Sequence, residues 1–202
     1  AIGADVVARR TTATARMSSP ALGRCSGVGG SIWPDAACAA IRSATARAYP
    51  HTVRLGDGTP VSLRLMTAAD AARIATFARN LPADDLLFLR MDITDPGAVA
   101  LWVGNLEAGL ATTVIAEANG ETAGYASLVQ NRVAWQRHLG EIRTQVGLPY
   151  RSRGLGRALA GEIFSIGRER GLRKIVAQMT TDQKGAIATF EPRLREVRVE
   201  VE

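Results

Sequence analysis

Apolar residues recur at every second position in several segments, which is the spacing of strands with one buried face. Val197, Val199 and Val201 show it plainly, with charged residues between them. Asn119-Gly120 separates two other segments, and Asn-Gly is typical of tight hairpin turns. The pattern predicts strands over six segments: 61–65, 112–117, 122–129, 142–146, 174–179 and 195–202.

Apolar positions spaced three to four residues apart predict helices between these strands. In the clearest case Leu155, Leu159, Ile163 and Ile166 form one apolar face, and Gly171 suits the C-terminal end of that helix. Shorter helices are expected over 67–81, 84–91, 95–108 and 183–191. Three consecutive strands followed by a strand–helix–strand unit predict an α/β (α+β) fold with one central sheet.

A glycine-rich basic loop, 151–156, joins the strand at 142–146 to the helix that starts at Leu155. The first N–H groups of a helix have no partner inside it, so they can bind an anion. Gly154 and Gly156 lack a Cβ and let an anion approach the backbone. The pattern predicts a phosphate site over 152–157, with added positive charge from Arg151, Arg153 and Arg157.

The run Arg151-x-x-Gly154-x-Gly156 after a strand resembles the acetyl-CoA-binding motif of the GNAT superfamily of N-acetyltransferases. The resemblance covers roughly residues 54–191 and implies a mixed, mostly antiparallel sheet flanked by helices. In that family the loop amides hold the pyrophosphate, and the end of the preceding strand pairs with the pantetheine arm. The positions that the resemblance assigns to acetyl-CoA are Gln145, Val146, Arg151, Ser152, Arg153, Gly154, Leu155, Gly156, Arg157 and Gln183.

The segment 56–90 is similar to the bacterial Pat-type protein-lysine acetyltransferases within this superfamily. In those enzymes a glutamate near the start of the fourth strand takes the proton of the acceptor amine, and Glu141 occupies that place. A base is needed because a lysine amine has a pKa near ~10.4 and is charged at neutral pH. Glu141 could equally form a surface ion pair with Arg143.

The segment 183–191 departs from the family pattern in two places. Gln183 stands where the family has asparagine, and Phe190 stands where it has the tyrosine that donates a proton to the leaving thiolate. Two functions therefore stay open. One is acetyl transfer from acetyl-CoA to a primary amine, either a protein lysine or a small amine. The other is a non-catalytic acyl-CoA-binding or regulatory module.

The first fifty residues differ in composition from the rest of the chain. The net charge of the chain is +6, and six arginines against two aspartates give this segment +4. It is rich in small residues without a clear period, so we expect residues 1–53 to be a disordered tail and 54–202 to be the domain. A transit peptide and translated upstream sequence are alternatives. Removing residues 1–50 would then leave stability unchanged.

Composition also bears on partners and location. No basic stripe interleaved with aromatic residues is present, which argues against nucleic-acid binding. No apolar run is long enough to cross a membrane. Cys25 and Cys38 have the spacing of neither a zinc site nor a disulfide framework, so we expect no metal and a reducing cytoplasm.

The C-terminal end is short for the family. A GNAT domain has two strands after the position of Glu191, and the last usually inserts between the fifth and the sixth. Only one strand can be built from 195–202. We therefore expect a truncated C-terminal edge, where the 174–179 strand pairs with the terminal strand or stays open. An open edge would favour a homodimer, low stability and weak turnover.

Overall fold

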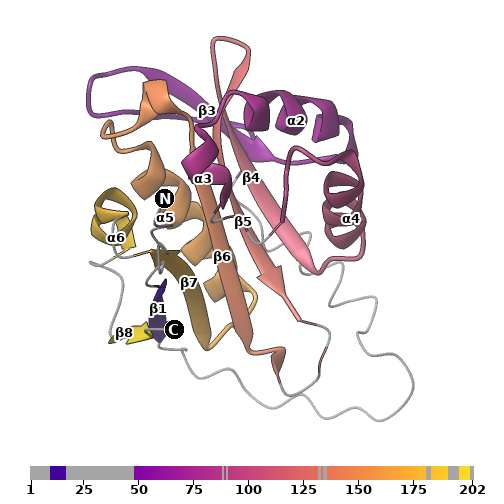
Figure 1. Ribbon diagram of the computed structural model, residues 1–202, viewed down its shortest axis with the longest axis vertical. Helices are drawn as coiled ribbons and strands as arrows, with labels where there is room; N and C mark the ends of the chain where they lie inside the picture. Colours follow the sequence, from indigo (N-terminus) through magenta and orange to yellow (C-terminus); the bar gives the residue numbers. More distant parts are fainter. Residues whose placement is uncertain are drawn as a thin grey trace, which may run out of the picture.

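A mixed sheet of eight strands forms the centre of the protein, in the order β2-β3-β4-β5-β6-β7-β1-β8 (Figure 1). The computed structural model describes residues 10–16, 48–87, 89, 91–131, 133, 136–180, 183–190 and 196–200. Neighbouring strands are antiparallel except β6 and β7, which are parallel. The strands are β1 (Arg10–Arg16), β2 (His51–Arg54), β3 (Pro60–Leu65), β4 (Ala111–Ala118), β5 (Glu121–Gln130), β6 (Leu139–Val146), β7 (Lys174–Thr180) and β8 (Glu196–Glu200).

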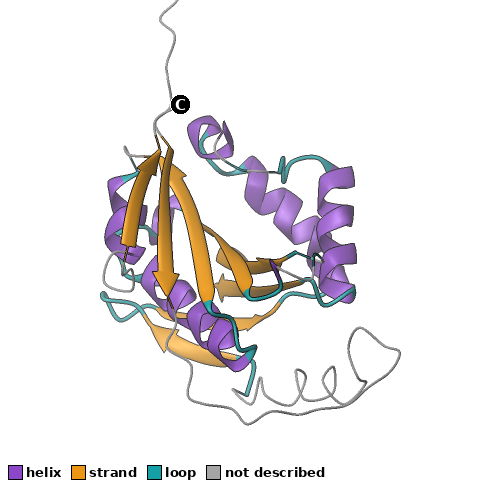
Figure 2. Ribbon diagram, turned by 90° about the horizontal axis from the view of Figure 1, so that it is seen from below, coloured by secondary structure: helices purple, strands orange, loops and turns teal. Residues whose placement is uncertain are grey.

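Helices cover both faces of the sheet (Figure 2). The α-helices are α2 (Ala71–Arg79), α3 (Ala83–Leu87), α4 (Pro96–Glu107), α5 (Leu155–Glu169) and α6 (Lys184–Phe190). On one face, α5 buries Leu155, Leu159 and Ile163 completely in the larger core. On the other, α2 and α4 pack on β4 and β5 around Ile115 and Tyr125. Within the described residues, no helix combines the length and apolar character needed to cross a membrane.

The predicted strands and helices agree with the structure to within a few residues at their ends. The mixed, mostly antiparallel sheet flanked by helices is therefore confirmed. Val61 and Leu63 are buried, as their alternation predicts. Two strands, β1 and β2, were missed. β2 has four residues, too few for a period to show, and it pairs with β3 across the turn at 56–59.

The N-terminal strand β1 corrects two expectations. It lies between β7 and β8, antiparallel to both, with its ends at the pairs Arg10↔Thr180 and Arg16↔Lys174. The prediction that β7 has an open edge or pairs directly with the terminal strand is therefore wrong. β1 lies between β7 and β8, which are the fifth and sixth of the strands predicted from the sequence. The sequence predicts no strand at this position.

Residues 10–16 were expected in a disordered tail because they carry no alternation of large apolar residues. Their pairing depends on backbone hydrogen bonds to two strands, and their threonines favour extended backbone. A side-chain period cannot reveal such a strand. The other residues of 1–47 lie outside the described residues, and the domain boundary at 53/54, which falls inside β2, stays a prediction.

A buried ion pair fixes the start of the helical layer on the α2 side. Arg64 donates two hydrogen bonds to Asp70, at 2.8 and 2.6 Å, and a third to Glu117 at 2.7 Å. Asp70 also accepts the backbone N–H of Thr67 at 2.8 Å, which caps the first turn before α2. The Arg64 hydrogen bonds are the main reason that the pKa of Asp70 falls to about 2.

This lowered pKa predicts how stability depends on pH. An aspartate with an unfolded pKa near ~3.9 and a folded pKa near 2 stabilises the fold above ~pH 4, and the contribution of about 2–3 kcal/mol is lost as the pH falls toward 2. We expect Asp70→Asn to lower the free energy of unfolding by about that amount at pH 6 and by roughly half as much at pH 3, measured by urea titration. The exposed Asp84→Asn variant is the control. An equal loss at both pH values would contradict the assignment.

Candidate functional site

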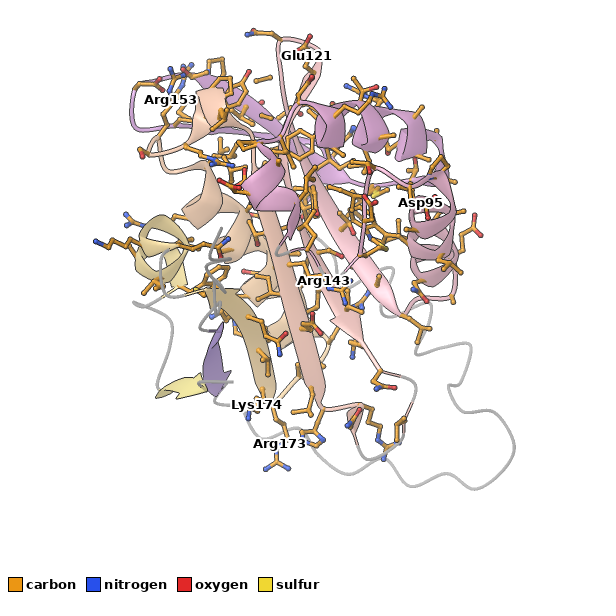
Figure 3. All side chains as sticks on the ribbon, viewed as in Figure 1. Asp95, Glu121, Arg143, Arg153, Arg173 and Lys174 are labelled. Atoms are coloured by element: carbon orange, nitrogen blue, oxygen red, sulfur yellow. The ribbon has the colours of Figure 1, made fainter. Side chains whose placement is uncertain are left out.

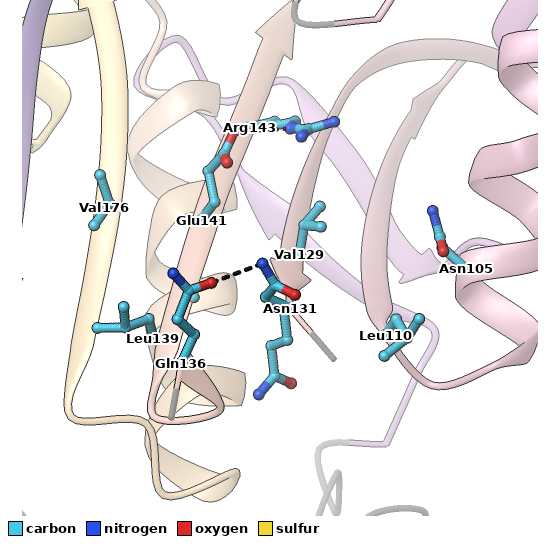
Figure 4. A pocket seen from close by; sticks show the side chains of 11 residues that line it. Asn105, Leu110, Val129, Asn131, Gln136, Leu139, Glu141, Arg143 and Val176 are labelled. Atoms are coloured by element: carbon cyan, nitrogen blue, oxygen red, sulfur yellow. Dashed lines mark hydrogen bonds and ion pairs between the residues drawn. The ribbon is translucent and has the colours of Figure 1, made fainter. Parts of the chain in front are cut away.

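The parallel strands β6 and β7 separate toward their C-terminal ends. They pair from Leu139↔Lys174 to Ile142↔Ala177 and no further, although β6 continues to Val146. Figure 4 shows β6 leaning away from β7 along its length. Because 143–146 have no ladder with β7, an extended ligand can pair with the backbone in this opening.

The loop after β6 leads directly into the N-terminus of α5. Ser152 and Gly154 have positive φ angles of 60° and 92°, which turn the chain into the helix. Leu155 is the first helical residue, and the first intrahelical bond of this turn runs from the N–H of Ala158 to the carbonyl of Gly154 at 3.0 Å. The N–H groups before Ala158 therefore have no acceptor within the helix and can bind an anion.

The backbone requires glycine at Gly154, whereas Gly156 has room for a small side chain. A Cβ on Gly154 would meet nothing within 4 Å, but its φ of 92° strains any other residue. A Cβ on Gly156 would contact Thr189 of α6 at 3.6 Å and Val146 at 3.7 Å, so this glycine lies where α6 approaches the start of α5. The space outside Gly154 is open, as an anion site requires.

Arg151 stabilises the loop rather than projecting from it. Its Nε donates to the carbonyl of Val146 at 3.0 Å, and its guanidinium forms an ion pair with Asp85 of α3. Gln145 also reaches α3, where its amide donates to the carbonyl of Asp85 at 3.4 Å. Arg151 therefore ties the end of β6 to the helical layer.

The other two arginines of the loop differ from each other. Arg153 forms an ion pair with Asp57 at 3.1 Å, and its carbonyl accepts the N–H of Gly56 at 2.9 Å. Figure 3 shows Arg153 at the loop end of the sheet, far from Arg143 over its face. Arg157 and Ser152 are exposed. Of Arg151, Arg153 and Arg157, only Arg157 forms no ion pair or side-chain hydrogen bond within the described residues.

Glu141 lies one residue before the end of the β6–β7 ladder, at the vertex of the opening. Glu141, Arg143 and Gln145 share one face of β6, because side chains alternate along a strand. Arg143 Nε donates to Glu141 Oε1 at 3.0 Å, and the two side chains are 30% and 22% exposed. The ion pair anticipated from the sequence is present, and it lies in a pocket rather than on an open surface.

That pocket has a volume of about 610 Å³ and lies on the face of the sheet that α4 covers in part (Figure 4). It is lined by Asn105, Leu110, Val129, Gln130, Asn131, Gln136, Leu139, Gly140, Glu141, Arg143 and Val176. Apart from Glu141, sequence reasoning singled out none of these side chains as a site residue. They come from a helix end, two connections and three strands, and no shared motif or spacing links them.

The last predicted segment forms α6. The carbonyl of Gln183 accepts the N–H groups of Ala186 and Ile187 at 3.0 and 3.1 Å, so Gln183 begins the helix. Phe190 is 5% exposed and packs on Phe164 of α5, with ring centroids 6.5 Å apart. The side chain that replaces the family tyrosine is therefore part of the core.

Three kinds of comparison bear on identity. Residues 77–194, more than half of the chain, match the family described as the Acetyltransferase (GNAT) family. No curated protein matches the chain.

Solved structures share the fold. The GNAT domain of PAT from S. lividans has a TM-score of 0.63 at 19% identity, covering 76% of this chain and 98% of that one. YncA from Salmonella typhimurium, solved with its cofactor acetyl-CoA, has a TM-score of 0.55 at 22% identity, covering 65% and 77%. A ribosomal-protein-alanine N-acetyltransferase from Brucella melitensis has a TM-score of 0.55 at 24% identity, covering 64% and 81%. With its β6–β7 opening, glycine loop and α5 N-terminus, the chain belongs to the acetyltransferase (GNAT) family.

Proposed function

We propose that this protein transfers an acetyl group from acetyl-CoA to a primary amine. The observation that carries the proposal is the position of Glu141, at the vertex where β6 and β7 separate and beside a pocket on the same face. The family match and neighbours solved with acetyl-CoA support this co-substrate.

The residues present fit acetyl-CoA. The N–H groups at the start of α5 face open space outside Gly154, where a pyrophosphate would lie. The backbone of 143–146 pairs with β5 on one side and has no ladder with β7 on the other, where it would hydrogen-bond the pantetheine arm as an added strand. When bound, acetyl-CoA supplies the activated acetyl thioester.

Glu141 would act as the general base. Arg143 donates to its Oε1 and so orients the carboxylate in the pocket, where it would take a proton from an amine. A charged amine has no lone pair, so proton removal must come before or with attack. Backbone N–H groups near Val146 would stabilise negative charge that develops on the acetyl oxygen.

A binding variant tests the co-substrate site. We expect Gly154→Val to weaken acetyl-CoA binding at least about tenfold in a calorimetric titration, because the side chain enters the open space before the α5 amides. Gly171→Val is a matched control, since Gly171 has a φ of 68° and open surroundings at the other end of α5. Equal affinities for the two variants would reject the site.

A non-catalytic acyl-CoA-binding module is the second candidate. The burial of Phe190 in the core favours it, because that position supplies no hydroxyl for the leaving thiolate. A free thiol has a pKa near ~8.5, however, so the thiolate can leave near neutral pH without a donor. Amine-dependent thiol release by the full chain supports the enzyme, and acetyl-CoA binding without release supports the module.

A further inference from the structure

The charges of the side chains that line the pocket cancel each other. Among its described lining residues, Glu141 carries the negative charge and Arg143 the positive charge, and the two are paired at 3.0 Å. A pocket with no net charge does little to attract a polyamine or a lysine-rich peptide, which carry several positive charges. An arginine beside the base also repels a second cation close to the reacting amine.

Arg143 has hydrogen-bond donors that it does not use within the described residues. A guanidinium has five N–H donors, and Arg143 uses its Nε–H on Glu141. No hydrogen bond from its two terminal nitrogens is recorded within the described residues. Figure 4 shows the side chain extending from β6 away from β7, toward the side where Val129 and Asn105 lie. Two parallel N–H groups of this kind are the donor pattern that matches a carboxylate.

We propose that the acceptor is a free α-amino acid, with its amine on Glu141 and its carboxylate on the terminal nitrogens of Arg143. This inference rests on the proposed acetyl transfer and names its substrate class. An α-amino acid carries both groups on one carbon atom, so a neighbouring base and guanidinium on one strand face can bind them together. A lysine side chain has no carboxylate near its amine and would leave Arg143 unmatched.

The rest of the pocket indicates an uncharged amino-acid side chain. Leu110, Val129 and Leu139 provide apolar surface, and the Asn131 and Gln136 amides hydrogen-bond each other at 2.7 Å. The volume of about 610 Å³ is ample for any amino acid, so the lining rather than the volume indicates the side chain. Methionine and leucine have apolar side chains that suit this lining.

The chemistry balances with the groups named. The amine nitrogen forms the amide bond to the acetyl carbon as the thioester C–S bond breaks. The ammonium group loses two protons. The first passes to Glu141 and on to solvent and frees the lone pair for attack, and the second leaves the nitrogen as the amide forms and protonates the thiolate, so the products are an N-acetylamino acid, the free thiol of coenzyme A and one released proton. The product amide is neutral and loses its attraction to Glu141, which aids release.

Matched ligand pairs test this directly. Binding of L-methionine and 3-(methylthio)propylamine, and of L-leucine and 3-methylbutylamine, is measured by calorimetry on the full chain without acetyl-CoA. We expect each amino acid to bind at least about tenfold more tightly than the amine that lacks its carboxylate. Steady-state thiol release should show the same ratio in kcat/KM.

Substitution of Arg143 supplies the second arm. Arg143→Met should abolish the preference for each amino acid over its amine, and Arg143→Lys should retain part of that preference. Arg137→Met, at an exposed arginine that does not line the pocket, is the control and should keep the full preference. Thermal unfolding confirms that each variant is folded.

Three results would overturn the inference: equal binding of an amino acid and its amine, a preference that survives Arg143→Met, or a lysine peptide that outcompetes both amino acids. Acetyl transfer itself would then stand if acetyl-CoA still binds and other amines release thiol. Loss of acetyl-CoA binding in the unsubstituted chain would instead reject the proposed function, and the calorimetric comparison would still report on the pocket.

Discussion

Replacing Glu141 by glutamine is expected to lower turnover by about 10²–10⁴-fold while the affinity for acetyl-CoA stays unchanged. Glutamine keeps the size of the side chain and can still accept a hydrogen bond from Arg143, but it cannot take a proton from the amine. The proposed co-substrate site lies further along the chain, at 143–157, so binding and catalysis should separate. Single-turnover thiol release and calorimetry on the same preparation measure the two effects.

The pH dependence distinguishes a base from a structural residue. As the pH approaches the amine pKa near ~10, an increasing fraction of the acceptor is neutral without help, and the deficit of Glu141→Gln should shrink. Glu169→Gln at the exposed end of α5 is the matched control and should retain full turnover. If Glu141→Gln turned over at a near-normal rate at pH 7, the Glu141–Arg143 pair would be structural only.

Most of the fold could be predicted because it depends on local signals. Val61 and Leu63 alternate and are buried, and Asn119-Gly120 forms the β4–β5 turn. The α5 helix begins at Leu155 and buries the face that its spacing predicts. Strand and helix periods, turn dipeptides and the glycine loop each act over a few residues, so they can be read without the tertiary structure.

The features that were missed depend on partners distant in sequence. Arg151 was expected to add charge at the loop, but Asp85, sixty-six residues away, holds it. The pocket joins Asn105, Asn131 and Gln136 to Glu141 only because the sheet places β5, β6 and β7 side by side and α4 packs against it. The proposed carboxylate-binding role of Arg143 likewise depends on its place in the lining of that pocket, which the sequence does not give.

The N-terminal strand β1 was also missed because its partners, β7 and β8, are distant in sequence. Because β1 belongs to the sheet, removing the N-terminal segment should lower stability instead of leaving it unchanged. β1 makes seven backbone pairs with β7 and five with β8, and it stands between them. Without it, β7 has an unpaired edge beside the proposed acetyl-CoA opening, and β8 loses its partner. An unpaired edge strand exposes N–H and C=O groups that pair readily with another chain.

Deleting residues 1–17 is therefore expected to lower the free energy of unfolding by about 3 kcal/mol or more, because net contributions of about 1 kcal/mol for each of several backbone hydrogen bonds are lost. This corresponds to a fall in Tm of roughly 10 °C for a domain of this size. The truncated chain should also self-associate, as measured by light scattering. Deleting residues 1–8 keeps β1 and is the matched control.

Two further measurements separate loss of the strand from a general effect of truncation. Thr12→Pro removes one ladder N–H in the middle of β1 and should reproduce part of the loss in Tm without shortening the chain. A synthetic peptide of residues 8–18, added to the chain that lacks 1–17, should raise its Tm in proportion to RT ln(1 + [L]/Kd) by rebuilding the strand. A truncated chain that stays monomeric and melts at the temperature of the full chain would show that the sheet is complete without β1.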